Sequence, residues 1–216
     1  MNRKSYIPTI AELAESEGVF TTSQAERMGI PRDALHDAVE SGRLERVVRG
    51  AYRMIGSGSE PTDELVAIWK LTSPAQFTHE RLVPSNWDGI AVGGSTASAI
   101  LEIGDLWLAP YRLYAPRRIN TRNDSVRFAV RAISYDEVAF RRGVPVTRAE
   151  RTVFDLVLDG EELSLVADVL GDAAHVDRDF DLGKLASYLR AAYPRGRADR
   201  ILEGLLADAG LTWTEG

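Results

Sequence analysis

The apolar positions near the N-terminus recur at the spacing of amphipathic helices. In residues 8–18, Ile10, Leu13 and Ala14 fall on one face, and Gly18 follows as a stop signal. The same i, i+3, i+4 spacing returns after residue 31 in a set of three apolar residues: Leu35, Ala38 and Val39. Both segments are therefore expected to be helices that bury one face and leave the other to solvent.

A shorter helix is expected between these two. Thr21 or Thr22 can cap it, because their hydroxyl groups accept hydrogen bonds from N–H groups that have no partner within the helix. The run Gly29-Ile30-Pro31 predicts a tight turn, since glycine closes one helix in the left-handed conformation and proline favours the start of the next. The order of these elements is that of a helix-turn-helix.

The periodicity changes after Gly42. Residues 44–48 and 51–54 are two short β-prone runs separated by Arg49-Gly50, a pair typical of a hairpin tip. Such a hairpin would be the wing of a winged helix-turn-helix. Four arginines lie on it against the single acid Glu45, a local balance of +3: Arg43, Arg46, Arg49 and Arg53.

Clustered arginine suits a surface that contacts duplex DNA, because neutralising phosphate charges releases counterions. The third helix would enter the major groove with its N-terminal side chains at the base edges. The candidate DNA-binding residues are Arg32, Asp33 and His36 on this helix and Arg43, Arg46, Arg49 and Arg53 on the wing. The acids Asp33, Asp37 and Glu40 oppose close approach to phosphate, so a winged helix that contacts protein, or an inactive relic, is the alternative.

Beyond the hairpin, the flexible composition of residues 56–61 indicates a linker between a DNA-binding domain, residues 1–58, and a second domain, residues 59–216. The second domain is expected to begin with a helix capped by Thr62 or Asp63. A strand at 90–92, a helix opened by residues 93–96 that continues through Leu101, and period-two runs at 106–114 and 126–132 follow. Helices are expected over 148–158, 161–174, 181–193 and 197–209. The fold class is therefore α+β, a winged helix-turn-helix followed by a mixed α/β domain ending in several helices.

The net charge of −6 is distributed unevenly along the chain. Residues 112–151 hold ten arginines against four acids, whereas residues 152–216 hold six basic residues against thirteen acids. Separate surfaces with separate partners are expected from such asymmetry. Five arginines of the basic segment are candidates for additional phosphate contacts: Arg117, Arg118, Arg122, Arg127 and Arg131.

The residues offer little support for catalysis or for a cofactor. The three histidines lie at spacings that metal sites do not use, and the chain has no cysteine, which fits a reducing cytoplasm. No apolar run approaches the ~20 residues of a membrane helix. The sequence Gly93-Gly94-Ser95-Thr96 precedes a helix but lacks a complete phosphate-binding fingerprint, so a plain helix start is favoured. No catalytic, cofactor or metal residues are therefore assigned.

The most sharply patterned part of the second domain has a structural interpretation. Thr147 is expected to cap a helix, with Glu150 at the third helical position as in a capping box. Arg151 and Asp155, at i and i+4, are expected to form an ion pair worth about 0.3–0.5 kcal/mol.

Several of these segments together resemble the AbiEi antitoxins of type IV toxin-antitoxin systems. They are GRLERVVRGAYRM, DELVAIW, GGSTASAILEIGDL and, above all, GVPVTRAERTVFDL followed by acidic helices. The resemblance extends from about Ile10 to Leu211. It implies a winged domain that binds operator DNA and represses its own operon, a second domain that counters a nucleotidyltransferase-like toxin, and no enzymatic activity. The short apolar runs lead us to expect no membrane partner.

Two other functions fit parts of the pattern. A nucleic-acid-processing enzyme could use the winged helix for targeting and the arginines of residues 112–151 as a substrate track. A ligand-sensing regulator without a toxin would be favoured if the neighbouring gene encoded no nucleotidyltransferase.

Overall fold

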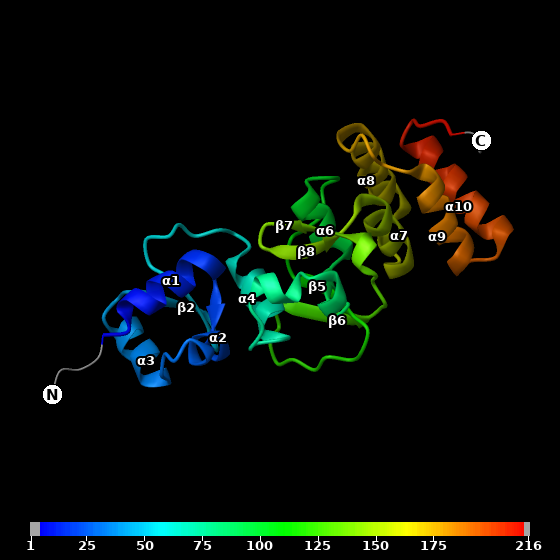
Figure 1. The fold of residues 1–216 in the computed structure, drawn as a ribbon. Coiled ribbons are helices and arrows are strands. Elements are labelled where there is room, and N and C mark those ends of the chain that lie inside the picture. Colours follow the sequence, from blue (N-terminus) through cyan, green and yellow to red (C-terminus); the bar gives the residue numbers. More distant parts are fainter. Residues whose placement is uncertain (1–4, 214–216) are drawn as a thin grey trace. The chain divides into compact units, whose positions relative to one another are not determined.

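The computed structural model describes residues 5–213, which form two compact units (Figure 1). The first unit extends to Asp88 and the second begins at Gly89. The boundary expected after residue 58 is therefore wrong, and the first unit includes a further helical segment.

The first half of this unit is a three-helix, three-stranded fold. Its strands form an antiparallel sheet in the order β1-β3-β2. The expected helices, turn and hairpin all form, with bounds within two residues of those expected. The elements are α1 (Ile7–Glu17), β1 (Phe20–Thr21), α2 (Thr22–Arg27), α3 (Arg32–Glu40), β2 (Leu44–Val48) and β3 (Ala51–Met54).

Local chemistry explains where these helices begin and end. Thr21 caps α2 in a capping box, in which the Gln24 N–H donates to the Thr21 hydroxyl at 3.1 Å and the Thr21 N–H donates to the Gln24 side chain at 2.9 Å. Gly29 has a φ of +75°, the left-handed conformation that the turn requires. The faces predicted to be buried meet in one core that includes Ile10, Leu13 and Leu35.

The first unit continues through three more elements, α4 (Asp63–Leu71), α5 (Thr78–Arg81) and the 3-10 turn η1 (Pro84–Asn86). Helix α4 packs against all three strands of the first sheet. Backbone carbonyls of residues 74–76 accept hydrogen bonds from the side chains of Thr21, Gln24 and Arg27. Residues 56–61 therefore connect β3 to α4 within one unit and do not link two domains.

A buried ion pair holds this addition in place. The Lys70 ammonium of α4 lies 2.6 Å from the Glu17 carboxylate at the end of α1, and both side chains are only 3% exposed. The same carboxylate accepts hydrogen bonds from the Thr78 hydroxyl at 2.6 Å and from Gln24 at 3.1 Å. Burial disfavours the charged carboxylate, but Lys70 and Thr78 outweigh it and lower the pKa of Glu17. The pair thus joins four segments of the first unit.

The second unit contains a five-stranded mixed sheet in the order β6-β5-β4-β8-β7. The pairs β4/β8 and β5/β6 are parallel, and β4/β5 and β7/β8 are antiparallel. Its elements are β4 (Ala91–Val92), α6 (Gly94–Leu101), β5 (Tyr111–Ala115), β6 (Val126–Val130), η2 (Tyr135–Glu137), β7 (Val138–Arg141), β8 (Val144–Thr147), α7 (Ala149–Asp159), α8 (Leu163–Val176), α9 (Leu182–Ala192) and α10 (Arg195–Asp208). The α+β fold class is confirmed.

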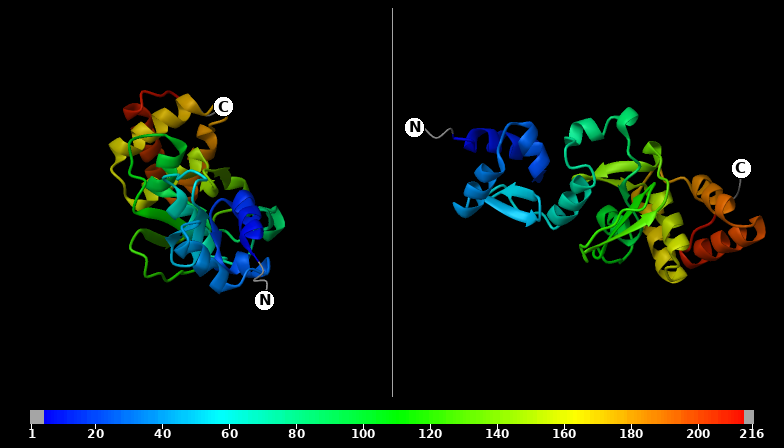
Figure 2. Two further views of the ribbon diagram at one scale, coloured as in Figure 1. Left: turned by 90° about the vertical axis from the view of Figure 1, so that its left-hand side faces the viewer. Right: turned by 90° about the horizontal axis from the view of Figure 1, so that it is seen from below.

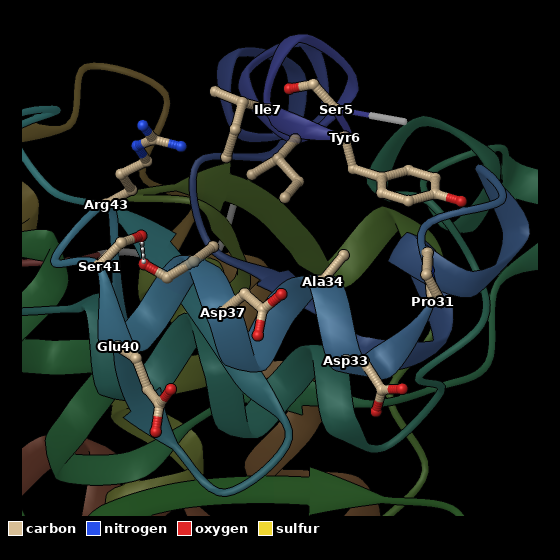
Figure 3. A pocket seen from close by; sticks show the side chains of 12 residues that line it. Ser5, Tyr6, Ile7, Pro31, Asp33, Ala34, Asp37, Glu40, Ser41 and Arg43 are labelled. Atoms are coloured by element: carbon tan, nitrogen blue, oxygen red, sulfur yellow. Dashed lines mark hydrogen bonds between the residues drawn. The ribbon is translucent and has the colours of Figure 1, made fainter. Parts of the chain in front are cut away.

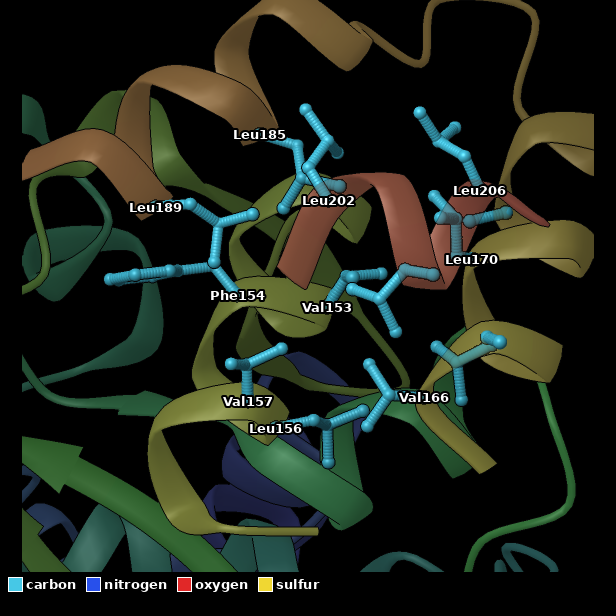
Figure 4. Close-up of a cluster of buried hydrophobic side chains, with 14 of the residues drawn as sticks. Val153, Phe154, Leu156, Val157, Val166, Leu170, Leu185, Leu189, Leu202 and Leu206 are labelled. Carbon is cyan, nitrogen blue, oxygen red and sulfur yellow. The ribbon is translucent and has the colours of Figure 1, made fainter. Parts of the chain in front are cut away.

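Helix α7 lies at the centre of the helical part of this unit. It packs against α6, α8 and α9, while α10 packs against α8 and α9. Helices α8 to α10, yellow to red, lie beyond α7 as seen from the sheet (Figures 1 and 2). Val153, Phe154 and Leu156 of α7 enter a continuous apolar core with leucines of the last two helices (Figure 4).

The predicted capping box at the start of α7 is wrong. Arg148 is the N-cap residue and makes no side-chain cap, and the Thr147 hydroxyl instead lies 2.8 Å from the Thr152 hydroxyl. Glu150 accepts a hydrogen bond from the Asp181 N–H at 3.0 Å. Thr147 is the last residue of β8, so its side chain is directed by the sheet and not by the helix.

Candidate nucleic-acid interface

The N-terminal half of α3 carries the three side chains expected at base edges. Arg32, Asp33 and His36 are all exposed. The Arg32 guanidinium donates a hydrogen bond of 2.6 Å to Glu26 of α2, which raises the pKa of Arg32. The structure thus leaves all three side chains accessible, with Arg32 engaged in a surface ion pair.

Three arginines of the hairpin are free of ion pairs with any residue from 5 to 213. Arg43 precedes β2, Arg46 lies on it and Arg49 is at the tip, and all three are exposed. The Arg46 guanidinium lies 5.7 Å from the centre of the Tyr52 ring on the neighbouring strand. Three guanidinium groups are therefore available for contact with an anionic partner.

The tip of the hairpin is held against the body of the first unit. The Thr22 N–H at the start of α2 donates to the Gly50 carbonyl at 2.9 Å. Gly50 has a φ of +91°, and a Cβ added to it would lie 3.5 Å from the Leu71 side chain of α4. The wing is therefore short, and these contacts fix the backbone at its tip, where Arg49 lies.

Arg53 does not join this group, contrary to the sequence-based expectation. Its side chain is 14% exposed and lies 2.5 Å from Glu45 and 3.4 Å from Asp63. It also donates to the Gly58 carbonyl at 2.8 Å. Arg53 therefore ties β3 to β2 and to the start of α4, and it is withdrawn as a candidate DNA contact.

The exposed surface of α3 is acidic overall. Asp33, Asp37 and Glu40 are exposed against Arg32 alone. The ligand atoms of His36, Asp37 and Glu40 lie within 4.8 Å of one another, a grouping that exposed helix surfaces often show without an ion. Approach of this helix to phosphate would therefore depend on the wing arginines.

The arginine-rich segment of the second unit divides into two sets. Arg117, Arg118, Arg122 and Arg127 are exposed, as phosphate contacts require. Arg131 is not available in this way, because its guanidinium lies 2.9 Å from each of the carboxylates of Asp155 and Asp159. Its assignment as a phosphate contact is corrected accordingly.

Arg131 belongs to a network of charges between the sheet and α7. The Arg151 guanidinium lies 3.0 Å from Asp155 and 2.6 Å from Glu137, so the predicted i, i+4 pair forms but is buried. Arg112 of β5 pairs with Asp159 at 3.0 Å. Three arginines pair with three acids in this network. Its structural role is to give each of these buried or half-buried charges a partner of opposite sign.

Tyr114 completes the network from β5. Its hydroxyl donates to Asp159 at 2.9 Å, and burial raises the pKa of Tyr114, so it remains a donor. A Cβ added to Gly93 would lie 1.8 Å from the Tyr114 ring. Gly93 is thus required for close packing against this ring, which supports the structural interpretation over a phosphate cradle.

Sequence reasoning missed the buried charges of the first unit. Besides Glu17 and Lys70, Arg81 is 1% exposed, lies 4.0 Å above the Trp69 ring and pairs with Asp88 at 2.8 Å. The only local signal in the sequence is Lys70, which lies among the apolar residues of α4.

The helices, the sheet and the basic hairpin of the first unit define a winged helix-turn-helix of the kind found in DNA-binding regulators. Residues 8–55 match the model of a family described as "Transcriptional regulator, AbiEi antitoxin". This match confirms the resemblance to AbiEi antitoxins over residues 8–55, from α1 to β3. No curated protein matches the chain. Among residues 5–213, no helix has both the length and the apolar character needed to cross a membrane.

Proposed function

We propose that this chain is a DNA-binding repressor of its own operon and the antitoxin for a nucleotidyltransferase-like toxin. The observation that carries the DNA-binding part is a set of three exposed arginines on an anchored hairpin beside a helix-turn-helix, none of which forms an ion pair within residues 5–213. The match of residues 8–55 to a family of antitoxin regulators supports the regulatory part. In this proposal, the second unit counters the toxin and performs no catalysis.

The arginines of the wing would contact the phosphate backbone. Arg43, Arg46 and Arg49 are exposed, and anchoring of the tip reduces the ordering needed on binding. Arg32, Asp33 and His36 would face base edges in the major groove. Arg32 must leave Glu26 to do so, and an exposed ion pair of this kind contributes little to stability.

Four arginines of the second unit would extend the phosphate contacts: Arg117, Arg118, Arg122 and Arg127. All are exposed, and such contacts position a protein on DNA without reading sequence. They would lengthen the footprint beyond the site covered by the wing and α3.

The test of DNA binding is a titration of the chain's own promoter region with the wild-type chain and with Arg46→Ala/Arg49→Ala. Each phosphate contact contributes about 0.9 to the slope of log K against log salt, so the variant should lose about two units of slope as well as affinity. The control is Arg178→Ala/Arg200→Ala, which removes two exposed arginines of the helical region. Unchanged affinity and slope in the wing variant would reject the wing as the DNA contact.

The test of antitoxin function is co-expression with the adjacent open reading frame. Toxicity of that reading frame alone and growth rescue by this chain are the expected results. Rescue by Arg46→Ala/Arg49→Ala is also expected when expression is driven from an unrelated promoter, because the proposal assigns neutralisation to the second unit. Absence of rescue by the wild-type chain would reject the antitoxin assignment and leave the DNA-binding test unaffected.

A further inference from the structure

Two concave regions of the structure differ in charge. A groove of about 730 Å³ between α1 and α3 has acids of α3 along it, among them Asp33 and Glu40 (Figure 3). This groove belongs to the candidate nucleic-acid interface, which includes Asp33. A smaller pocket of about 260 Å³ lies in the second unit and has two arginines in its lining. Its lining residues, as far as the structure describes them, include none of the proposed DNA contacts and none of the charges between the sheet and α7. We name it the β7–α7 pocket.

Much of the lining of the β7–α7 pocket is apolar. Ile103, just after α6, and Ala149, at the start of α7, are 3% and 6% exposed. Val176 at the end of α8 also lines the pocket, yet it is 65% exposed. Covering such an exposed apolar side chain with an apolar group removes it from water, which is favourable. The pocket therefore suits the apolar part of a ligand.

Arg141 of β7 and Arg148 before α7 bring positive charge to this pocket. Both are exposed, and neither forms an ion pair within residues 5–213. The Arg141 guanidinium donates to the Phe140 carbonyl at 3.1 Å, and the Arg148 guanidinium donates to the Asp136 carbonyl at 3.0 Å. Each bond uses one of the five N–H donors of an arginine, so most donors of both guanidinium groups remain available to a ligand.

The acids near these arginines do not cancel their charge. Asp177 is the only acid among the lining residues that the structure describes, and its carboxylate accepts a hydrogen bond from the Asp179 N–H at 3.0 Å. Asp136 lies near Arg148 but does not line the pocket, and a hydrogen bond from the Ser134 hydroxyl lowers the pKa of Asp136. Two guanidinium groups against one carboxylate in the lining leave one positive charge, which suits a monoanion.

The volume and the strand geometry narrow the class of ligand. Pockets for drug-sized molecules measure about 300–1,000 Å³, so 260 Å³ fits a smaller molecule. Ala139 and Arg141 are two residues apart on β7, which puts their side chains on the same face of the strand. A guanidinium thus lies beside the apolar lining, and guanidinium groups bind carboxylates through two parallel hydrogen bonds.

We propose that the β7–α7 pocket binds a small organic carboxylate with an apolar body. The carboxylate pairs with Arg141 and Arg148, and the apolar body covers Val176. Because the lining comes from both strand and helix ends of the second unit, the bound ligand stabilises this unit. The site lies wholly within the second unit, so the proposal depends on neither DNA binding nor antitoxin function.

The test is a titration of the full chain with benzoate, followed by ligand-observed NMR. A dissociation constant on the order of 1 mM is expected for a ligand of this size. Benzyl alcohol has the ring without the charge, and acetate has the charge without the ring. Each should bind at least about tenfold more weakly than benzoate, because each lacks one of the two proposed contacts. Hydrogen exchange in peptides that cover residues 138–149 and 170–177 should slow when benzoate is added.

Three variants test the site directly. Arg141→Gln and Arg148→Gln should each weaken benzoate binding about tenfold, because each removes a charged hydrogen-bond donor. Ala139→Leu should also weaken binding, because the larger side chain fills the pocket while both arginines stay in place. The matched control is Arg178→Gln, which replaces an exposed arginine beside Asp177 that does not line the pocket and should leave the dissociation constant unchanged.

Circular dichroism of each variant establishes that it is folded. Failure of benzoate to bind would overturn the proposal. Equally tight binding of benzyl alcohol, or a dissociation constant that neither arginine variant changes, would also overturn it.

Discussion

Replacing Lys70 with methionine should destabilise the first unit far more than its position on the helix suggests. Methionine keeps an unbranched apolar stem, so the change removes the ammonium group with little change in packing. The Glu17 carboxylate, 3% exposed, then loses the partner that lies 2.6 Å away. Its remaining partners are the neutral donors of Thr78 and Gln24.

The magnitude follows from the two ways in which the carboxylate can respond. Leaving one member of a buried pair charged and alone typically costs about 3–5 kcal/mol. Taking up a proton instead costs about 3.7 kcal/mol at pH 7 for a group whose ordinary pKa is about 4.3. The cheaper response sets the loss, so Lys70→Met should lower the free energy of unfolding of the first unit by about 3–4 kcal/mol at pH 7.

Hydrogen exchange, resolved to peptides of residues 5–88, is the suitable assay, because two compact units can unfold separately and a single transition would mix them. The control is Arg32→Met, which breaks an exposed pair with Glu26 at 2.6 Å and should leave the stability of the first unit nearly unchanged. A loss below about 1 kcal/mol for Lys70→Met would refute the assignment of Glu17 and Lys70 as a buried pair that holds α4.

Two other predictions concern pH and packing. Because the pKa of Glu17 is lowered in the folded state, the wild-type first unit should lose stability as pH falls from about 4.3 through that lower pKa. The loss of unfolding free energy caused by Lys70→Met should shrink between pH 7 and pH 5, because Glu17 of the variant takes up a proton. Chemical denaturation at several pH values measures both effects, and a loss that does not change with pH would contradict the second. Gly93→Ala should destabilise the second unit by about 1–3 kcal/mol or more, because the new methyl group would lie 1.8 Å from the Tyr114 ring. Gly204 lies in α10, and a Cβ added to it would have no other atom within 4 Å. Gly204→Ala should therefore stabilise the second unit by about 0.5–1 kcal/mol. Equal effects of the two changes in urea unfolding would argue against the packing explanation.

The sequence by itself predicted the winged helix-turn-helix because each of its signals is local. The apolar spacing of α1 and α3, the cap at Thr21, the turn at Gly29 and the hairpin at Arg49-Gly50 each depend on residues a few positions apart. The side chains of Arg43, Arg46 and Arg49 follow from these elements, and their exposure agrees with the expected wing.

Only the tertiary structure decided where the first unit ends and which arginines face solvent. The Glu17–Lys70 pair joins residues 53 positions apart, so residues 59–88 read locally as the start of a new domain although they complete the first one. Arg127 and Arg131 look alike in a period-two pattern, yet only Arg131 meets Asp155 and Asp159, which lie on a helix more than twenty residues away. Charge pairing at such distances is set by how the strands and helices pack, and no local pattern encodes it.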